Sequence, residues 1–308
     1  AFLFPGQGSQ SLNMMDGFAA PIVKETFDEA SEALGEDLWA MLKADSAEAI
    51  NQTINTQPLM LAAGVATYRA WLAAGGATPT HFAGHSLGEY SALVAADALD
   101  FDDAVRLVRL RAEAMQSAVP AGEGAMAAVL GLDDAEIVLA CAEAAAGDVV
   151  SAVNFNAPGQ VVIAGSKAAV DRAIAACKAR GAKRAMPLPV SVPSHCALMR
   201  PAADKLAEAL VGISVNVPLV PVIHNADVAS YTDSAAIRDA LVRQLYSPVR
   251  WTETIRLLAA QGVLHQAECG PGKVLAGLNK RIEASVVSFA LTNDAALETT
   301  LDTLAALS

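Results

Sequence analysis

A serine between two glycines, at the point where an extended segment gives way to a helix, constrains this chain more than any other feature. The segment Gly84-His85-Ser86-Leu87-Gly88 follows a short apolar stretch at 80–83 and precedes a helical segment at 89–96. Together these form a nucleophile elbow, in which flanking glycines let the strand and helix backbones approach closely. The pattern GxSxG alone is weak, but this context predicts that Ser86 is a nucleophile rather than an idle serine in a structural turn.

Length and charge limit what kind of protein this is. A chain of 308 residues that is 54% hydrophobic and 18% charged can bury one large core and a smaller second one. No uncharged apolar run reaches the roughly 18 residues that cross a membrane, and the segment AFLFPGQGSQ lacks the basic start of a secretory leader. We therefore expect a cytoplasmic protein with no membrane partner, and the formal net charge of −12 argues against nucleic acid as well.

The four cysteines give no sign of a metal site or a disulfide framework. They stand far apart with no CxxC pair, at Cys141, Cys177, Cys196 and Cys269. Widely spaced cysteines of this kind are usually small buried apolar residues. We expect four buried thiols and no bound metal.

The stretch from 124 to 190 shows an order of expected strands and helices that differs from the rest of the chain. Extended segments are expected at 124–130, 149–155, 160–165 and 184–190, with helices at 133–146 and 167–180. The resulting order, βαββαβ, is the ferredoxin-like pattern, whose two ends meet at one edge so that it can be inserted into another domain. We therefore expect a discontinuous host domain, residues 1–122 and 192–308, interrupted by an insert at 123–191.

The rest of the chain also divides into short strands and helices. The expected strands lie at 1–4, 80–83 and 219–223, with a further strand, turn and helix within 264–278. The expected helices cover 21–34, 58–74, 89–96 and 101–117, and another begins near 234.

A nucleophilic serine needs a base, and five histidines are available. A hydroxyl is a weak nucleophile at neutral pH unless a neighbouring side chain takes its proton, and histidine suits that task best. Four histidines lie beside the elbow or at expected strand ends: His81, His85, His224 and His265. His195 instead follows the turn Val192-Pro193-Ser194, where the insert returns the chain to the host and could overhang the elbow. A histidine satisfied within a loop fits the same sequence.

Acyl transfer also needs donors for the negative oxygen of the tetrahedral intermediate. Such an oxyanion hole usually takes the N–H of the residue after the nucleophile and a second N–H from a loop after an early strand. Leu87 supplies the first here, and Gln7, between two glycines, is placed to supply the second. The same glycine-rich loop could instead bind phosphate, but its spacing matches neither a P-loop nor a dinucleotide fingerprint.

One arginine of the helix expected at 101–117 points toward the core. At about 100° per residue the apolar residues of this helix form one arc, and Arg111 falls within about 60° of its centre. Arg106 and Arg109 fall well outside it. A buried guanidinium needs an anionic partner, which is either an acidic side chain of this protein or a carboxylate that arrives with a substrate.

These segments together resemble one family over the whole chain: the malonyl-CoA:acyl carrier protein transacylases and the related acyltransferase domains of fatty acid and polyketide synthases. The matching segments are FPGQGSQ at 4–10, TQP at 56–58, GHSLGEYSAL at 84–93, RLRAEAMQ at 109–116, NFNAPGQ at 154–160, PSH at 193–195 and ECGPG at 268–272. The resemblance implies an α/β fold, with an α/β-hydrolase-like large domain and a ferredoxin-like insert.

The resemblance also implies a reaction. Ser86 would carry the malonyl group of malonyl-CoA as an ester, and His195 would activate the serine and later protonate the leaving thiol. The N–H groups of Gln7 and Leu87 would form the oxyanion hole. After CoA leaves, the phosphopantetheine thiol of acyl carrier protein would attack the ester, with no metal or bound cofactor involved.

Further residues are implied around the substrate. Arg111 would hold the malonyl carboxylate, and Gln57, Asn225 and His85 would line the binding site, although His85 is expected to point away from the nucleophile. No carboxylate completes a catalytic triad in this family. The backbone carbonyl of Gln244 would orient the histidine instead.

A basic docking surface is expected because acyl carrier proteins are strongly acidic. The candidates are Lys178, Arg180, Lys183, Arg184, Lys280 and Arg281. An ordinary solvated helix surface explains the same residues equally well.

Three other interpretations stay open at this point. The first is a serine hydrolase such as a thioesterase, and the second is a non-catalytic acyl-binding subunit on the same fold. The third is transfer of methylmalonyl or another extender unit, because the residue before the histidine tracks extender choice in polyketide relatives. That residue, Ser194, is not the bulky one typical of their malonyl-selective domains.

Overall fold

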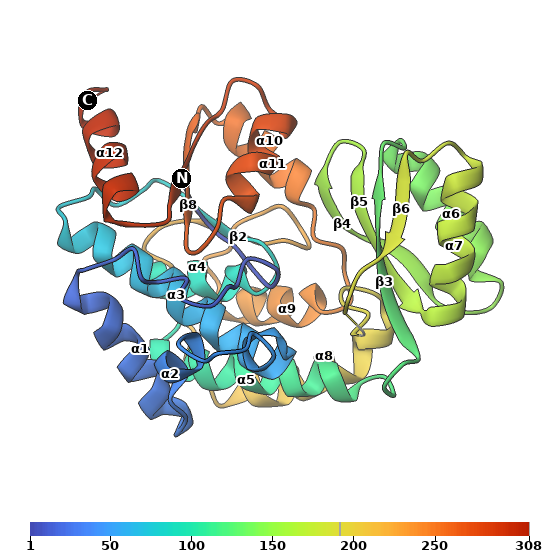
Figure 1. The fold of residues 1–308 in the computed structure, drawn as a ribbon, viewed down its shortest axis with the longest axis horizontal. Helices are drawn as coiled ribbons and strands as arrows, with labels where there is room; N and C mark the ends of the chain where they lie inside the picture. The colour runs from blue at the N-terminus through green and yellow to red at the C-terminus, as the bar shows by residue number, and fades with distance from the viewer. Residues whose placement is uncertain (191, 308) are drawn as a thin grey trace.

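Two β-sheets organise the protein, which we describe from a computed structural model covering residues 1–190 and 192–307 (Figure 1). The larger sheet has five parallel strands in the order β7-β2-β1-β8-β9. Its strands are β1 (Phe2–Phe4), β2 (Phe82–Gly84), β7 (Val222–Ile223), β8 (His265–Cys269) and β9 (Val287–Leu291). The carboxyl ends of these strands therefore lie along one edge.

Helices cover both faces of this sheet because its side chains alternate between two cores. Phe2 and Phe4 of β1 face one core, whereas Leu3 faces the other. The first core is covered mainly by α1 (Pro21–Leu34), α2 (Leu38–Leu42), α3 (Thr53–Ala73), α4 (Gly88–Ala95), α5 (Phe101–Ser117), α8 (Arg200–Val211) and α9 (Ser234–Gln244). The second is covered by α10 (Trp251–Ala260) and α11 (Val274–Ile282). The last helix, α12 (Asp294–Ala305), packs beside β9.

The smaller sheet is antiparallel and has the strand order β4-β5-β3-β6. Its elements are β3 (Gly124–Leu130), α6 (Asp134–Ala145), β4 (Val150–Ala157), β5 (Gln160–Ser166), α7 (Lys167–Ala179) and β6 (Arg184–Pro187). Figure 1 shows α6 and α7 on the outer face of this sheet, away from the larger one. The inner face carries Met126, Val153 and Val162, which pack with Cys196.

A short parallel bridge joins β4 to the part of the chain that holds the larger sheet. Asn154 pairs with Val249, the Phe155 N–H donates to the Val249 carbonyl at 3.0 Å, and the Val249 N–H donates to the Val153 carbonyl at 2.8 Å. These bonds fix the inner face of the smaller sheet opposite the elbow.

Most elements expected from the sequence are present. The helices at 21–34 and 101–117 and the strand at 124–130 have the expected bounds, and the order βαββαβ is confirmed. The strand before the elbow begins two residues later than expected, and β6 ends at Pro187 rather than at 190. Ser191, the last residue of the expected insert, lies outside the described residues. The elements α2, α8, α10, β9 and α12 were not predicted.

Two simpler expectations can also be compared with the structure. All four cysteines are buried and free, as predicted. None of the helices in the described residues is long and apolar enough to cross a membrane.

Candidate active site

The predicted elbow is present at the carboxyl end of β2. Ser86 has a φ of +53°, in the left-handed region that a serine adopts only when its surroundings impose it. A Cβ on Gly84 would lie 1.9 Å from the Gly88 carbonyl carbon, and one on Gly88 would lie 2.0 Å from the Phe4 carbonyl oxygen. Only glycine fits at either position, so the strand and helix close tightly and the serine side chain projects from the turn.

His195 meets this serine, as the sequence predicted. The distance between His195 Nε2 and Ser86 Oγ is 2.7 Å, and that between His195 Nδ1 and the Gln244 carbonyl oxygen is 2.8 Å. Because a carbonyl can only accept, Nδ1 carries the proton and Nε2 is left to accept from the serine. His195 also has a positive φ, of 64°, and its N–H donates to the Leu245 carbonyl. The turn after the smaller sheet thus overhangs the elbow.

Burial keeps His195 neutral. The residue is 3% exposed, and the pKa of its imidazole is lowered to about 3, first by burial and second by the positive charge of Arg111. The pKa of an ordinary histidine is about 6.5, so about half of such side chains are protonated at that pH. His195 is therefore ready to accept a proton at neutral pH.

This lowered pKa predicts a flat pH profile. The value of kcat/KM for acylation of Ser86, which reports on groups of the free protein, is expected to show no loss as the pH falls from 8 through 6.5 to about 5. The unfolded chain binds a proton on this histidine below about pH 6.5 whereas the folded chain does not, so folding stability declines toward acid. Initial rates should therefore be paired with a thermal melt at each pH. A loss of kcat/KM centred near 6.5, with the protein folded, would contradict the assignment.

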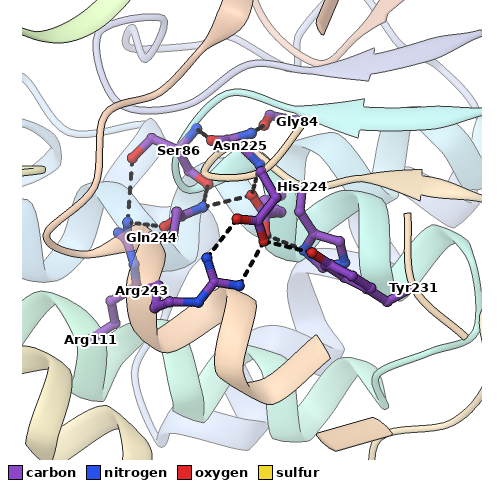
Figure 2. A network of polar contacts seen from close by, with 10 residues as sticks. Gly84, Ser86, Arg111, His224, Asn225, Tyr231, Arg243 and Gln244 are labelled. Carbon is purple, nitrogen blue, oxygen red and sulfur yellow. Dashed lines mark hydrogen bonds and ion pairs between the residues drawn. The ribbon is translucent and has the colours of Figure 1, made fainter. Parts of the chain in front are cut away.

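Arg111 lies where the helix geometry placed it. It is 1% exposed, and one of its hydrogen bonds goes to Gln57 Oε1 at 2.8 Å. The other two, shown in Figure 2, go to Gln244 Oε1 at 2.9 Å and to Ser86 Oγ at 3.3 Å. None of the salt bridges among the described residues involves it, whereas Arg109 on the same helix pairs with Glu36 through both of its terminal nitrogens. Of the two partners left open for Arg111, an acidic side chain in direct ion-pair contact is not found among the described residues.

An unpaired guanidinium so close to the nucleophile has an energetic cost. Burying a charge costs several kcal/mol unless an opposite charge pairs with it directly, and the nearby carboxylate of Glu89 reaches Arg111 only through the Gln244 amide. The Arg111 Nε also has no partner within the described residues. The site thus has spare capacity for an anion that arrives from outside.

The two predicted oxyanion donors lie close to each other. A Cβ on Gly6 would come within 2.5 Å of the His85 carbonyl oxygen and 3.6 Å of the Leu87 nitrogen, so the loop at 6–8 packs directly on the elbow. Within residues 1–190 and 192–307, neither the N–H of Gln7 nor that of Leu87 donates a hydrogen bond to the chain. Both donors are free to hold a developing negative oxygen.

A cavity of about 460 Å³ opens above these groups, between the two sheets. Its polar lining includes Ser86, His195, Arg111, Gln57 and Gln7. Its apolar lining residues are Met115, Met126, Leu188, Pro189, Val190 and Val192. Such a cavity is large enough for an acyl group and part of its carrier arm.

Comparison with known proteins agrees with this geometry. Residues 1–288 match the family model described as "Acyl transferase domain". The malonyl CoA-acyl carrier protein transacylase of Escherichia coli (strain K12) is 62% identical over 304 residues, which cover 98% of both chains. The chain belongs to the acyl transferase family of malonyl CoA-acyl carrier protein transacylases. The resemblance predicted from its motifs is confirmed.

A more distant relative and two solved structures are also similar to this acyl transferase over nearly its full length. The Bacillus subtilis protein of the same name is 46% identical over 308 residues, covering 99% of this chain and 96% of its own. An acyl carrier protein S-malonyltransferase from Vibrio cholerae has a TM-score of 0.95 and 57% identity, covering 97% and 98% of the two chains. A malonyl-transacylase solved with its type II PKS acyl-carrier protein has a TM-score of 0.97 and 56% identity, covering 98% of both.

Of two residues predicted to line the binding site of this acyl transferase, His85 lies as expected and Asn225 does not. His85 lines the cavity but turns from the serine, and its Nε2 lies 2.8 Å from Asn156 Oδ1. Asn225 is buried behind the nucleophile, where its Oδ1 accepts from the Ser86 N–H at 2.7 Å and its Nδ2 donates to the Gly84 carbonyl at 2.6 Å. Asn225 thus holds the elbow and does not line the cavity, because the loop after β7 passes behind the turn.

Sequence reasoning missed two features of the site. Glu89 was treated only as the start of α4, yet its carboxylate is fully buried behind Ser86. Asn154 lines the cavity, with its Oδ1 buried and unpartnered within the described residues. A charged residue at a buried helix position was the available signal for Glu89, and Asn154 lay within the motif NFNAPGQ without a role.

The six basic residues predicted for docking divide into two groups. Arg180 is committed to Glu136 and Glu143 of α6, at 2.5 and 2.6 Å, on the helical layer that also carries Lys178. The register of the smaller sheet pairs Arg184 with Leu130 and Leu130 with Gln160, and Arg281 donates to Gln160 Oε1. Arg184 and Arg281 therefore lie at one end of this sheet, next in sequence to Lys183 and Lys280, and the docking role of the six residues stays a prediction.

Proposed function

We infer that this acyl transferase moves a malonyl group from malonyl-CoA to the phosphopantetheine thiol of acyl carrier protein, through an ester on Ser86. One observation carries the choice of acyl group: a buried arginine without an acidic partner donates to the oxygen of the nucleophile itself. A planar guanidinium binds a carboxylate through two parallel hydrogen bonds. Malonyl is the short acyl group that brings such a carboxylate next to its thioester.

The first half of the reaction acylates the serine. Ser86 Oγ attacks the thioester carbonyl carbon while His195 Nε2 takes its proton, and the N–H groups of Gln7 and Leu87 hold the resulting oxyanion. The C–S bond then breaks, and the CoA sulfur leaves with the proton from His195. The backbone carbonyl of Gln244 keeps the imidazole in the required tautomer throughout.

The second half repeats the same steps with a different thiol. The carrier protein's phosphopantetheine thiol gives its proton to His195 and attacks the ester carbonyl, and Ser86 leaves with that proton. All the groups needed are side chains and N–H groups of this chain, so we propose that no bound cofactor or metal takes part. Because CoA thioesters and holo carrier protein are the substrates, we also propose a cytoplasmic location, with no nucleic-acid or membrane partner for a chain of net charge −12.

The architecture is best described as an α/β-hydrolase-like domain with a ferredoxin-like insert. We propose residues 1–122 and 192–308 for the first and 123–191 for the second. The serine elbow after a strand of a parallel sheet supports the first description. The antiparallel order β4-β5-β3-β6, with two helices on one face, supports the second.

Intact-protein mass tests the proposed function. The chain is mixed briefly with malonyl-CoA, acetyl-CoA or methylmalonyl-CoA in separate reactions. We expect an adduct of malonyl mass only, which is lost again when holo acyl carrier protein is added and then appears on that protein. An adduct lost as quickly to water as to the carrier would indicate a thioesterase, and an equal methylmalonyl adduct would indicate a broader extender specificity. Absence of any adduct would sink the proposal in favour of a non-catalytic subunit.

We propose that acyl carrier protein docks on the four basic residues Lys183, Arg184, Lys280 and Arg281. Reversing charge at two of them, Lys183→Glu with Arg184→Glu, is expected to raise KM for carrier protein about tenfold and to leave KM for malonyl-CoA unchanged. Surface charge pairs of this kind mainly raise the rate at which the two proteins associate. The increase in KM should therefore be smaller in 0.5 M salt, at which the Debye length is only about 4 Å.

The control for docking is Lys167→Glu. Lys167 follows Ser166, which pairs with Gly124 at the opposite end of the same sheet, and it is equally exposed to solvent. The same reversal of charge there should leave both KM values unchanged. Equal effects of the double variant on carrier protein and on malonyl-CoA would show that these residues do not dock the carrier.

A further inference from the structure

A fully buried carboxylate lies behind the nucleophile without touching the cavity. Glu89, the second residue of α4, is 0% exposed and does not line the pocket. Its Oε1 lies 2.6 Å from His224 Nδ1, and its Oε2 accepts from the Asn225 N–H at 2.8 Å and from Gln244 Nε2 at 3.0 Å. A buried charge is costly unless several donors satisfy it, so these three contacts indicate a specific task.

The two amide side chains next to Glu89 both hold the backbone of Ser86 (Figure 2). Asn225 Oδ1 accepts from the Ser86 N–H at 2.7 Å, and Gln244 Nε2 donates to the Ser86 carbonyl at 2.9 Å. The N–H and the carbonyl of Ser86, whose φ is positive, are therefore held by the side chains of two residues that one carboxylate binds, Asn225 through its backbone N–H and Gln244 through its side-chain amide.

Glu89 also decides which way the Gln244 amide points. At one end, Gln244 Oε1 accepts from Arg111 Nη2 at 2.9 Å, and at the other end its Nε2 donates to Glu89. The reverse orientation would place an N–H₂ group against the guanidinium and an oxygen against the carboxylate. Gln244 is thus held between a buried cation and a buried anion, and it keeps Arg111 in place while the guanidinium remains open to an incoming carboxylate.

We propose that Glu89 is a positioning residue for acyl transfer. Through its hydrogen bonds to Asn225 and Gln244 it holds Ser86 in its reactive backbone conformation. Through Gln244 it also holds Arg111 in the position that meets the substrate carboxylate. The part that concerns Arg111 rests on the proposed malonyl transfer. The part that concerns Ser86 does not, because it applies to any acylation of this serine.

Two conservative substitutions of Glu89 separate the effect of its side-chain length from the effect of its negative charge. In Glu89→Gln the side chain keeps its length, one oxygen still accepts from Asn225 and Gln244, and the new N–H₂ donates to His224 Nδ1, whose proton can move to the unpartnered Nε2. In Glu89→Asp the charge stays, but the carboxylate withdraws by about 1.5 Å. Hydrogen bonds of 2.6 to 3.0 Å cannot all survive such a retreat.

The rate at which a fluorophosphonate labels Ser86 is the first readout, because it requires the serine and His195 but no malonyl group. Glu89→Gln is expected to label within tenfold of the native rate, and Glu89→Asp about 100-fold more slowly, the usual result of a misplacement of about 1 Å. The opposite ranking, equal loss in both variants, or native rates in both would overturn the proposal.

The second readout is the ratio of malonyl to acetyl adduct formation, followed by intact mass. Glu89→Asp should lower this ratio about tenfold because Arg111 loses the support of Gln244, and Glu89→Gln should retain it. If the native protein itself takes up no malonyl group, the proposed function fails while the labelling result still decides the role of Glu89. An unchanged ratio in Glu89→Asp would remove the Arg111 part of the proposal.

Asp227→Asn provides a matched control. Asp227 is a neighbouring carboxylate that pairs with Arg243 at 2.6 Å and accepts from Tyr231 at 2.8 Å, and neither partner contacts Ser86. The control should lose thermal stability, yet keep the native labelling rate and adduct ratio. A purely structural role for Glu89 would make Glu89→Asp behave in the same way.

Discussion

Replacing Ser86 by alanine is expected to abolish the malonyl adduct and to lower malonyl transfer by on the order of 10³-fold or more. His195→Ala should cause a loss of similar size, because the serine keeps its proton when no base lies 2.7 Å from its oxygen. The two side chains act as one unit. The double variant should therefore be no slower than Ser86→Ala alone.

Rapid-mix assays with holo carrier protein measure these losses, and circular dichroism with thermal melts verifies that each variant is folded. The free N–H groups of Gln7 and Leu87 remain in all three variants, so binding of malonyl-CoA should persist with a similar dissociation constant. Losses that multiply in the double variant would mean that serine and histidine act in separate steps, which the ester mechanism does not allow.

Arg111→Ala is expected to lower kcat/KM for malonyl-CoA by about 10²- to 10³-fold while leaving the slow acylation by acetyl-CoA unchanged or faster. Removing one partner of a buried charge-assisted contact costs roughly 2 to 5 kcal/mol, which sets the size of the malonyl loss. Acetyl has no carboxylate and gains nothing from the guanidinium. Its adduct should rise if the positive charge of Arg111 also restrains the base, since that charge lowers the pKa of His195.

Arg109→Ala is the matched control, since Arg109 lies on the same helix and pairs with Glu36 away from the cavity. It should lower stability by about 1 kcal/mol and leave the ratio of malonyl to acetyl turnover unchanged. Arg111→Lys should recover only part of the malonyl activity, because an ammonium cannot offer the same two parallel donors. Equal losses for malonyl and acetyl in Arg111→Ala would show that this arginine supports the site without selecting the acyl group.

The parts of the site that depend on local sequence were predictable. The elbow follows from two glycines at fixed spacing around Ser86, and the inward direction of Arg111 follows from the phase of one amphipathic helix. The pairing of Ser86 with His195 needed more than local pattern. The turn before the histidine suggested it, and the family resemblance decided it.

The parts that depend on contacts between distant segments were not predictable. Glu89 meets His224, Asn225 and Gln244, which lie 135 to 155 residues away in the sequence. No helical or strand period reports such contacts. The ion pairs of Arg180 are of the same kind: its spacing fits a solvated helix face, but it pairs with Glu136 and Glu143 of the adjacent α6, which the sequence pattern does not report. The edge strand β9 was missed because its residues are mostly half-exposed and lack a clear alternation.

The order of strands along the chain has a consequence for how the protein matures during synthesis. The smaller sheet is built from one continuous stretch, from Gly124 to Pro187, and its contacts are local enough to form early. The larger sheet instead places β1 and β2, made first, beside β7 and β8, made much later. Gln244, which holds both the histidine and the elbow, also leaves the ribosome late. A growing chain is therefore expected to carry no reactive serine until the residues of β8 have been made.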